Sequence, residues 1–142
     1  MNVRLWVFIR MEQEKIPKIL VIDDDPFIVD MYVIKLKDEH FVVETARDGK
    51  EGLMKIKEYK PDVVLLDIVM PVLDGFGVLE ALQGDGSKTC KVILLTNLGQ
   101  QQDVERGMRL GADDYMIKAH FTPSEVIEKG KEIRPEWVLK VS

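Results

Sequence analysis

The sequence predicts an α/β fold, a doubly wound parallel sheet in which five strands alternate with helices. Short apolar runs alternate with stretches of helical spacing about ten residues long, the pattern that produces parallel crossovers. The runs 19–22, 63–66 and 92–95 are continuously apolar, as expected of strands covered by helices on both faces. No repeat or low-complexity tract interrupts this alternation, so we expect one domain.

Each element is predicted from its own pattern. The apolar run 18–23 is the first strand, and Asp25 followed by Pro26 gives the N-cap and first turn of a helix. Apolar residues then recur at helical spacing as far as Leu36. The next elements are, in order, a strand 41–45, a helix 52–59 after the turn Asp48-Gly49, a strand 62–67, a helix 74–82, a strand 91–96, a helix 100–110 ended by Gly111, and a strand 114–118.

A last helix is predicted from Thr122 and Glu125, which have the spacing of a capping box, to about residue 134. Met54 and Met108 stand at helical core spacing, so we expect both to pack in the interior.

Length and composition fix the domain organisation and the broad class. We expect an N-terminal extension over 1–16, one domain over 17–134 and a short C-terminal tail over 135–142. Met11 can serve as an alternative start, which would make residues 1–10 an upstream artefact. The apolar run 5–9 is too short to cross a bilayer.

The net charge and the cysteine content limit the classes of partner and the cellular compartment to be expected. The net charge of −5 gives no basic surface for nucleic acid, so neither nucleic acid nor a membrane is expected as a partner. The single cysteine, Cys90, excludes an internal disulfide and is expected to be a small core residue, which together with the absence of an export signal predicts a cytoplasmic protein.

Residues that can carry chemistry follow the predicted strands. They are Asp23 and Asp24 after the first strand, Asp67 after the third, Thr96 after the fourth and Lys118 after the fifth. Ligands of open parallel sheets bind at the carboxyl ends of the strands, so these residues are expected to converge on one cleft.

The carboxylates raise a question of charge. At about 4 Å and an effective dielectric constant near 20, each ionised pair costs roughly 4 kcal/mol, more than helix capping by Asp23 or Asp24 returns. A divalent cation with a preference for oxygen ligands, such as Mg²⁺, removes the conflict and leaves water positions open for a phosphate. Lys118 and Thr96 are suited to phosphoryl oxygens, and a carboxylate can itself be the nucleophile in phosphoryl transfer. The sequence therefore predicts Mg²⁺ beside a phosphorylatable aspartate.

These motifs, in this order and spacing, resemble those of the receiver domains of bacterial-type response regulators, over residues 17–134. The matching stretches are VIDD at 21–24, DIVMPVLDG at 67–75, LT at 95–96 and YMIK at 115–118. The resemblance implies a five-stranded flavodoxin-like sandwich with strand order 2-1-3-4-5, which agrees with the pattern of elements above.

The resemblance also implies roles for particular residues. Asp67 would accept a phosphoryl group from a sensor histidine kinase or a phosphotransfer protein, without the chain being an enzyme in its own right. Mg²⁺ would be held by Asp23, Asp24, Asp67 and the backbone carbonyl of Val69.

Signal output is implied to depend on a switch. Thr96 and Lys118 would contact the phosphoryl group, and Tyr115 would turn inward as Thr96 moves. As a stand-alone, CheY-like receiver, the chain would signal by contact with an output protein, which the sequence does not name, and a homodimer stays open.

One residue departs from the family pattern. Ala119 follows Lys118 where the family usually has proline, often with a cis bond. A cis bond before alanine costs about 2.5–4 kcal/mol, so a trans bond is expected. This departure keeps open a receiver-fold scaffold that is not phosphorylated. A third reading, an aspartate-nucleophile phosphohydrolase, rests on the Asp-x-Asp spacing of Asp23 and Asp25, but Pro26 does not fit its motif.

Overall fold

A parallel sheet forms the middle layer of the molecule, with strand order β2-β1-β3-β4-β5. All four neighbouring pairs are parallel. The strands are β1 (Lys18–Ile22), β2 (Val42–Ala46), β3 (Val63–Asp67), β4 (Lys91–Thr96) and β5 (Asp114–Ile117). The predicted fold class and strand order are therefore confirmed.

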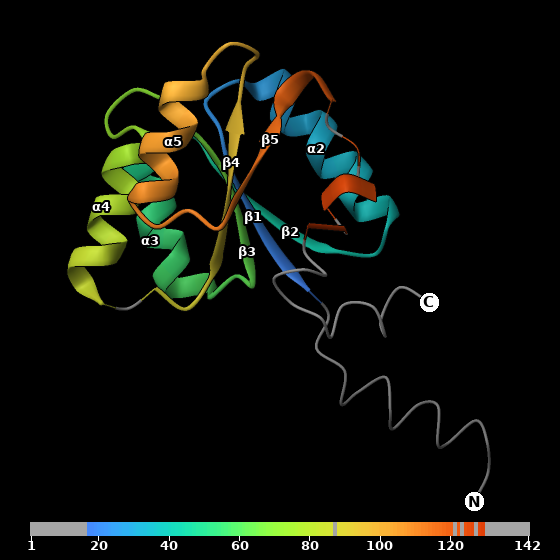
Figure 1. The fold of residues 1–142 in the computed structure, drawn as a ribbon. Coiled ribbons are helices and arrows are strands. Elements are labelled where there is room, and N and C mark those ends of the chain that lie inside the picture. Colours follow the sequence, from blue (N-terminus) through green and yellow to red (C-terminus); the bar gives the residue numbers. More distant parts are fainter. Residues whose placement is uncertain (1–16, 87, 121, 123, 127, 130–142) are drawn as a thin grey trace, which may run out of the picture.

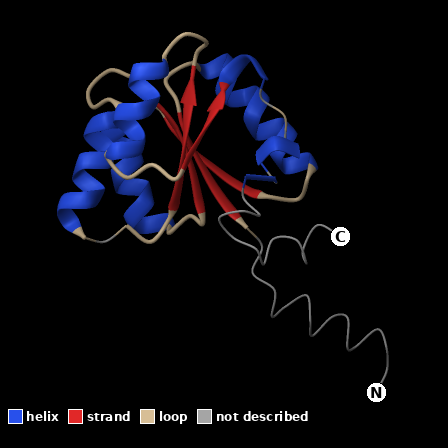
Figure 2. Ribbon diagram, in the orientation of Figure 1, coloured by secondary structure: helices blue, strands red, loops and turns tan. Residues whose placement is uncertain are grey.

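Helices cover both faces of this sheet (Figure 2). The computed structural model describes residues 17–86, 88–120, 122, 124–126 and 128–129. Within these residues lie the helices α2 (Pro26–Asp38), α3 (Gly49–Tyr59), α4 (Gly75–Asp85) and α5 (Gln101–Arg109). In Figure 1, α3, α4 and α5 lie on one face, and α2 lies on the other with the helical residues 124–126 and 128–129.

Alternate residues of each central strand enter two separate hydrophobic clusters. Leu20 and Leu66 belong to the cluster under α3 and α4, whereas Ile19 and Leu65 belong to the cluster that includes Tyr32 of α2. Since successive side chains of a strand point to opposite faces, both sets must be apolar when both faces are covered. The continuous apolar runs in the sequence reflect this requirement.

Aspartates begin three of the helices. The side chain of Asp25 accepts hydrogen bonds from the backbone N–H groups of Phe27 and Ile28, that of Asp48 from Glu51, and that of Asp74 from Gly77. Each carboxylate satisfies N–H groups that have no partner within the helix. The caps thus hold Asp25, Asp48 and Asp74 at the starts of their helices.

Some boundaries and packing predictions differ from the structure. Helix α3 begins at Gly49, not at residue 52, because Asp48 is its N-cap and not part of a free turn. Strand β5 ends at Ile117, and a 3₁₀ turn follows over Lys118–His120. Met54 and Met108 are 55% and 39% exposed, so the prediction that they pack in the interior was wrong.

The prediction of a last helix is met as far as the chain is described. Residues 124–126 and 128–129 are helical, and the backbone N–H of Glu125 donates to the Thr122 hydroxyl at 3.1 Å. The predicted end near residue 134 lies outside the described residues, as do the extension 1–16 and the tail 135–142. Among the helices in the described part of the chain, none has the length and apolar character needed to span a membrane.

Candidate functional site

The strand register brings the chemical groups predicted from the sequence to one edge of the sheet. Ile22 is level with Leu66, so Asp23 and Asp67 are the next residues on neighbouring strands. Thr96 is level with Ile117, which places Lys118 directly beyond it. These residues come from β1, β3, β4 and β5, and only the sheet makes them neighbours.

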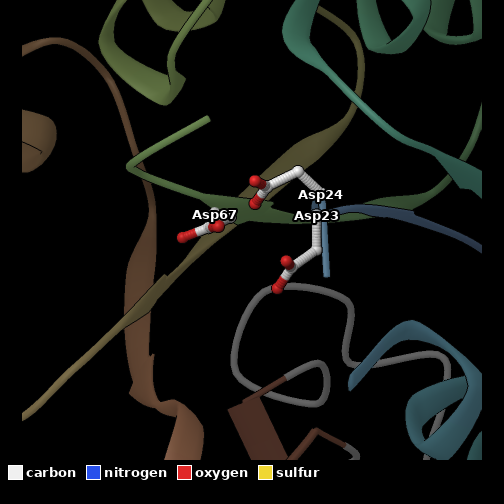
Figure 3. Close-up of side chains that lie close together, drawn as sticks. All are labelled: Asp23, Asp24 and Asp67. Carbon is white, nitrogen blue, oxygen red and sulfur yellow. The ribbon is translucent and has the colours of Figure 1, made fainter. Parts of the chain in front are cut away.

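Three carboxylates form the centre of the site. Asp23, Asp24 and Asp67 each offer an oxygen atom, and these atoms lie within 4.8 Å of one another. Figure 3 shows their side chains gathered where β1 and β3 end. Asp23 and Asp67 are buried, and Asp24 is exposed. The site is thus anchored in the interior and open on the side of Asp24.

Lys118 lies against two of these acids. Its Nζ is 3.0 Å from Asp67 Oδ1 and 3.1 Å from Asp23 Oδ2, and its side chain is largely buried. Burial lowers the pKa of the Lys118 ammonium, but its contacts with Asp67 and Asp23 outweigh this and leave the pKa raised. Lys118 is therefore a fixed positive charge in the site.

The pKa of the Asp67 carboxyl group is shifted upward, toward neutral pH. Burial raises its pKa from the ordinary 3.8 to about 6, and the Asp23 carboxylate adds to the rise. Lys118 and a hydrogen bond from the backbone of Val69 act in the opposite direction. At pH 7 the Asp67 carboxylate is mostly ionised, and it keeps more basicity than an exposed aspartate has.

The donor set fits a hard divalent cation. Three carboxylates against one ammonium leave negative charge in excess, and two of these acids are buried. Mg²⁺ prefers oxygen ligands and retains water, which the exposed side of Asp24 allows. Val69 lies in the loop after β3, with its backbone beside Asp67 and its side chain 65% exposed.

The hydroxyl of Thr96 is not engaged with the acids. Thr96 is buried at the end of β4, with its Oγ1 2.9 Å from Gln100 Oε1 and 3.1 Å from the carbonyl oxygen of Asn97. In the part of the chain that the structure describes, no hydrogen bond joins Thr96 to Asp67. Tyr115 of β5 is 43% exposed.

Gln100 was not predicted from the sequence. A glutamine at the start of a helix has no motif of its own, and its contact with Thr96 arises from the turn of the chain between β4 and α5. The one available signal was the four-residue separation of the two residues, which many unrelated pairs share.

Two further residues bear on the alternatives. Asp25 is the N-cap of α2 and is not among the three clustered acids. The phosphohydrolase hypothesis needs Asp25 as its second acid, so this position counts against it. The described residues contain no cis peptide bond, so the bond between Lys118 and Ala119 is trans, as expected.

Comparison with known proteins identifies a family for this chain. The family model of the response regulator receiver domain matches residues 19–130. A DNA-binding dual master transcriptional regulator, RpaA of Synechocystis, is 42% identical over 103 residues, covering 72% of this chain and 43% of that protein. The alkaline phosphatase synthesis transcriptional regulatory protein PhoP of Bacillus subtilis is 40% identical over 116 residues, covering 82% and 48%. The chain thus spans less than half the length of these relatives.

A solved structure shows the similarity at the level of the fold. The chemotaxis protein CheY4 of Vibrio cholerae superposes with a TM-score of 0.74 at 29% identity, over 84% of this chain and 99% of that one. The chain belongs to the response regulator receiver domain family.

Proposed function

We propose that the chain is a phosphorylation-controlled switch in which Asp67 accepts a phosphoryl group from a histidine of a sensor kinase or phosphotransfer protein. Receiver domains are phospho-acceptors of two-component signalling, and their partners are histidine kinases. The observation that carries the proposal is the contact of Lys118 Nζ with Asp67, 3.0 Å, inside a cluster of three acids.

The proposed transfer is a displacement at phosphorus. A carboxylate oxygen of Asp67 attacks the phosphorus, the N–P bond of phosphohistidine breaks, and its electron pair stays on the imidazole. Lys118, held beside Asp67, would then donate a hydrogen bond to a phosphoryl oxygen, because the Asp67 carboxylate loses its negative charge when the new bond forms. Asp23, Asp24, Asp67 and the Val69 carbonyl would hold Mg²⁺, which supplies neutralisation of phosphoryl charge when bound.

Output is proposed to follow from Thr96 and Tyr115. The Thr96 hydroxyl would turn from Gln100 to the phosphoryl group, and Tyr115, now half exposed, would fill the space it leaves. Such a change biases the surface of α5 and β5 between two states, which a partner protein can read. The DNA binding named for RpaA is not carried over, because the chain matches less than half of that protein.

The proposal also includes a cytoplasmic location for the protein.

The test is intact mass spectrometry after incubation with acetyl phosphate. One added phosphoryl group is expected with Mg²⁺, and none with EDTA or in Asp67→Asn. The matched control is Asp30→Asn, which removes an exposed carboxylate on α2 and should be labelled like the wild type. Label that persists in Asp67→Asn would refute the assignment of the acceptor.

The scaffold alternative predicts a different result. A folded protein that binds Mg²⁺ but takes no phosphoryl group from acetyl phosphate or from a phosphorylated phosphotransfer protein would support it. Ala119→Pro, which restores the residue usual in the family, would then be the first variant to test.

A further inference from the structure

The contact between Thr96 and Gln100 is a candidate control point outside the acid cluster. The Thr96 hydroxyl has one proton, and both acceptors within reach, Gln100 Oε1 and the Asn97 carbonyl oxygen, belong to the segment that leads into α5. The proton of Thr96 is therefore directed away from Asp67. For Thr96 to donate to a phosphoryl oxygen, this contact must break.

Gln100 is itself held in place by a second bond. Its Oε1 accepts the backbone N–H of Asn97 at 3.0 Å, so one amide oxygen receives both that N–H and the Thr96 hydroxyl. The carbonyl oxygen of Gln100 accepts from the N–H of Val104, which starts the first turn of α5. The side chain thus joins the end of β4 to the beginning of α5.

Because the Gln100 side chain bonds to Thr96 and Asn97, helix α5 lacks a side-chain cap at its N-terminus. Gln100 occupies the N-cap position of α5 but makes no side-chain capping hydrogen bond, whereas Asp25, Asp48 and Asp74 all cap their helices. A capping residue normally points its acceptor into the first turn of the helix. Here the acceptor points back to the strand end.

We propose that Gln100 is a positioning residue that holds the Thr96 hydroxyl in the resting state and so sets the threshold for activation. The proposal rests on the proposed function. Since the bond exists only in the resting arrangement, its loss favours the arrangement in which Thr96 faces Asp67. A neutral hydrogen bond of ordinary net strength corresponds to a change of about two- to tenfold in that equilibrium.

The test uses beryllofluoride with Mg²⁺, a mimic of the phosphoryl group on aspartate, titrated by calorimetry. Gln100→Leu is expected to bind it about two- to tenfold more tightly than the wild type. Gln102→Leu is the matched control, because this exposed glutamine lies two positions along the chain on α5, and it should leave binding unchanged. Equal binding by Gln100→Leu and Gln102→Leu would overturn the proposal.

A double-mutant cycle shows whether the effect passes through the hydroxyl. In a Thr96→Val background the Asn97 N–H still loses its acceptor when Gln100 is replaced, but there is no hydroxyl to release. Gln100→Leu should therefore have no effect on beryllofluoride binding there. An effect of the same size in both backgrounds would show that Gln100 acts on the loop alone and would also overturn the proposal.

A measurement on the unliganded protein separates this proposal from the proposed function. Three-bond couplings to the Thr96 methyl carbon should report one side-chain rotamer in the wild type and an average in Gln100→Leu. Gln100→Glu keeps an acceptor oxygen at the same reach and should restore the single rotamer. An unchanged rotamer in Gln100→Leu would refute the contact itself. If the wild type binds no beryllofluoride, the proposed function fails, and the role of Gln100 in activation fails with it.

Discussion

At the scale of single residues, backbone strain stands out next to the site. Val72, in the loop between β3 and α4, has φ of 70°, and its side chain is 76% exposed. A residue with a branched Cβ is strongly disfavoured in this left-handed region. Because Val72 is exposed, packing contacts offset little of the free energy of this strain. The strain lies in the segment that links Asp67 to the start of α4.

Val72→Gly is expected to raise the free energy of unfolding by about 1 kcal/mol, because glycine adopts this backbone conformation without strain. Urea denaturation of the metal-free protein measures the change. Val69→Gly is the control, since Val69 is an exposed valine of the same loop without a positive φ, and it should not stabilise. A loss of stability in Val72→Gly would contradict the strain.

The raised pKa of Asp67 predicts how Mg²⁺ binding depends on pH. The proton and the cation compete for the same carboxylate, so the apparent dissociation constant should rise as pH falls through about 6. Well below that pH the rise approaches about tenfold per pH unit. Calorimetry between pH 5 and pH 8, at about one-unit steps, follows the effect, and Asp67→Asn should remove it.

The same shift fixes the sign of a stability effect in the metal-free protein. Because the folded pKa of Asp67 lies above its ordinary value of 3.8, the folded state holds the proton more tightly than the unfolded chain does. This group's contribution to stability is therefore fully present below pH 3.8 and is lost as pH rises through about 6. Ionised Asp67 is a cost to the fold at neutral pH.

At the scale of elements, the start of α4 is fitted closely to the acceptor loop. The N–H of Gly75 donates to the carbonyl oxygen of Ile68 at 2.8 Å. A Cβ at Gly75 would lie 2.6 Å from the carbonyl oxygen of Asp67 and 2.9 Å from the Cα of Ile68. Both are backbone atoms, so the loop that carries Asp67 would have to move.

Gly75→Ala is expected to destabilise the fold by about 1–3 kcal/mol and to weaken Mg²⁺ binding, because it displaces the backbone of Asp67. Gly84→Ala is a matched control on the same helix, since a Cβ there meets no atom of the described residues within 4 Å. It should leave Mg²⁺ binding unchanged and raise stability slightly. Chemical denaturation and Mg²⁺ titration of both variants check this, and equal behaviour would show that the close contact is tolerated.

The limits of sequence reasoning also appear at this scale. The central strands β1, β3 and β4 were predicted well because they must be apolar on both faces and because polar residues mark their ends. Met54 and Met108 were misjudged because helical spacing alone does not say how wide the buried stripe of a helix is. The φ of Val72 and the Gln100 contact depend on loop shape, which has no periodic pattern.

At the scale of the whole molecule, the acid cluster couples stability to the cation. A ligand that binds only the folded state stabilises it, and Mg²⁺ at ten times its dissociation constant should add about 1.4 kcal/mol. Thermal unfolding with and without Mg²⁺ measures the shift, and Asp67→Asn should show a smaller one. Identical melting curves for the wild type in both conditions would exclude Asp23, Asp24 and Asp67 as a Mg²⁺ site.

Strand order also has a consequence for how the chain folds. Strand β1 pairs with β2 and β3, whereas β5 pairs, among the described residues, with β4 alone and carries Lys118 directly after it. An intermediate built from the first three strands would gather the three acids before their ammonium partner arrives. Like charges would then oppose folding until the last strand docks. We expect refolding to be slowest at low ionic strength, where the repulsion between the carboxylates is least screened. Divalent cations should accelerate refolding, because they would neutralise the carboxylates before Lys118 docks.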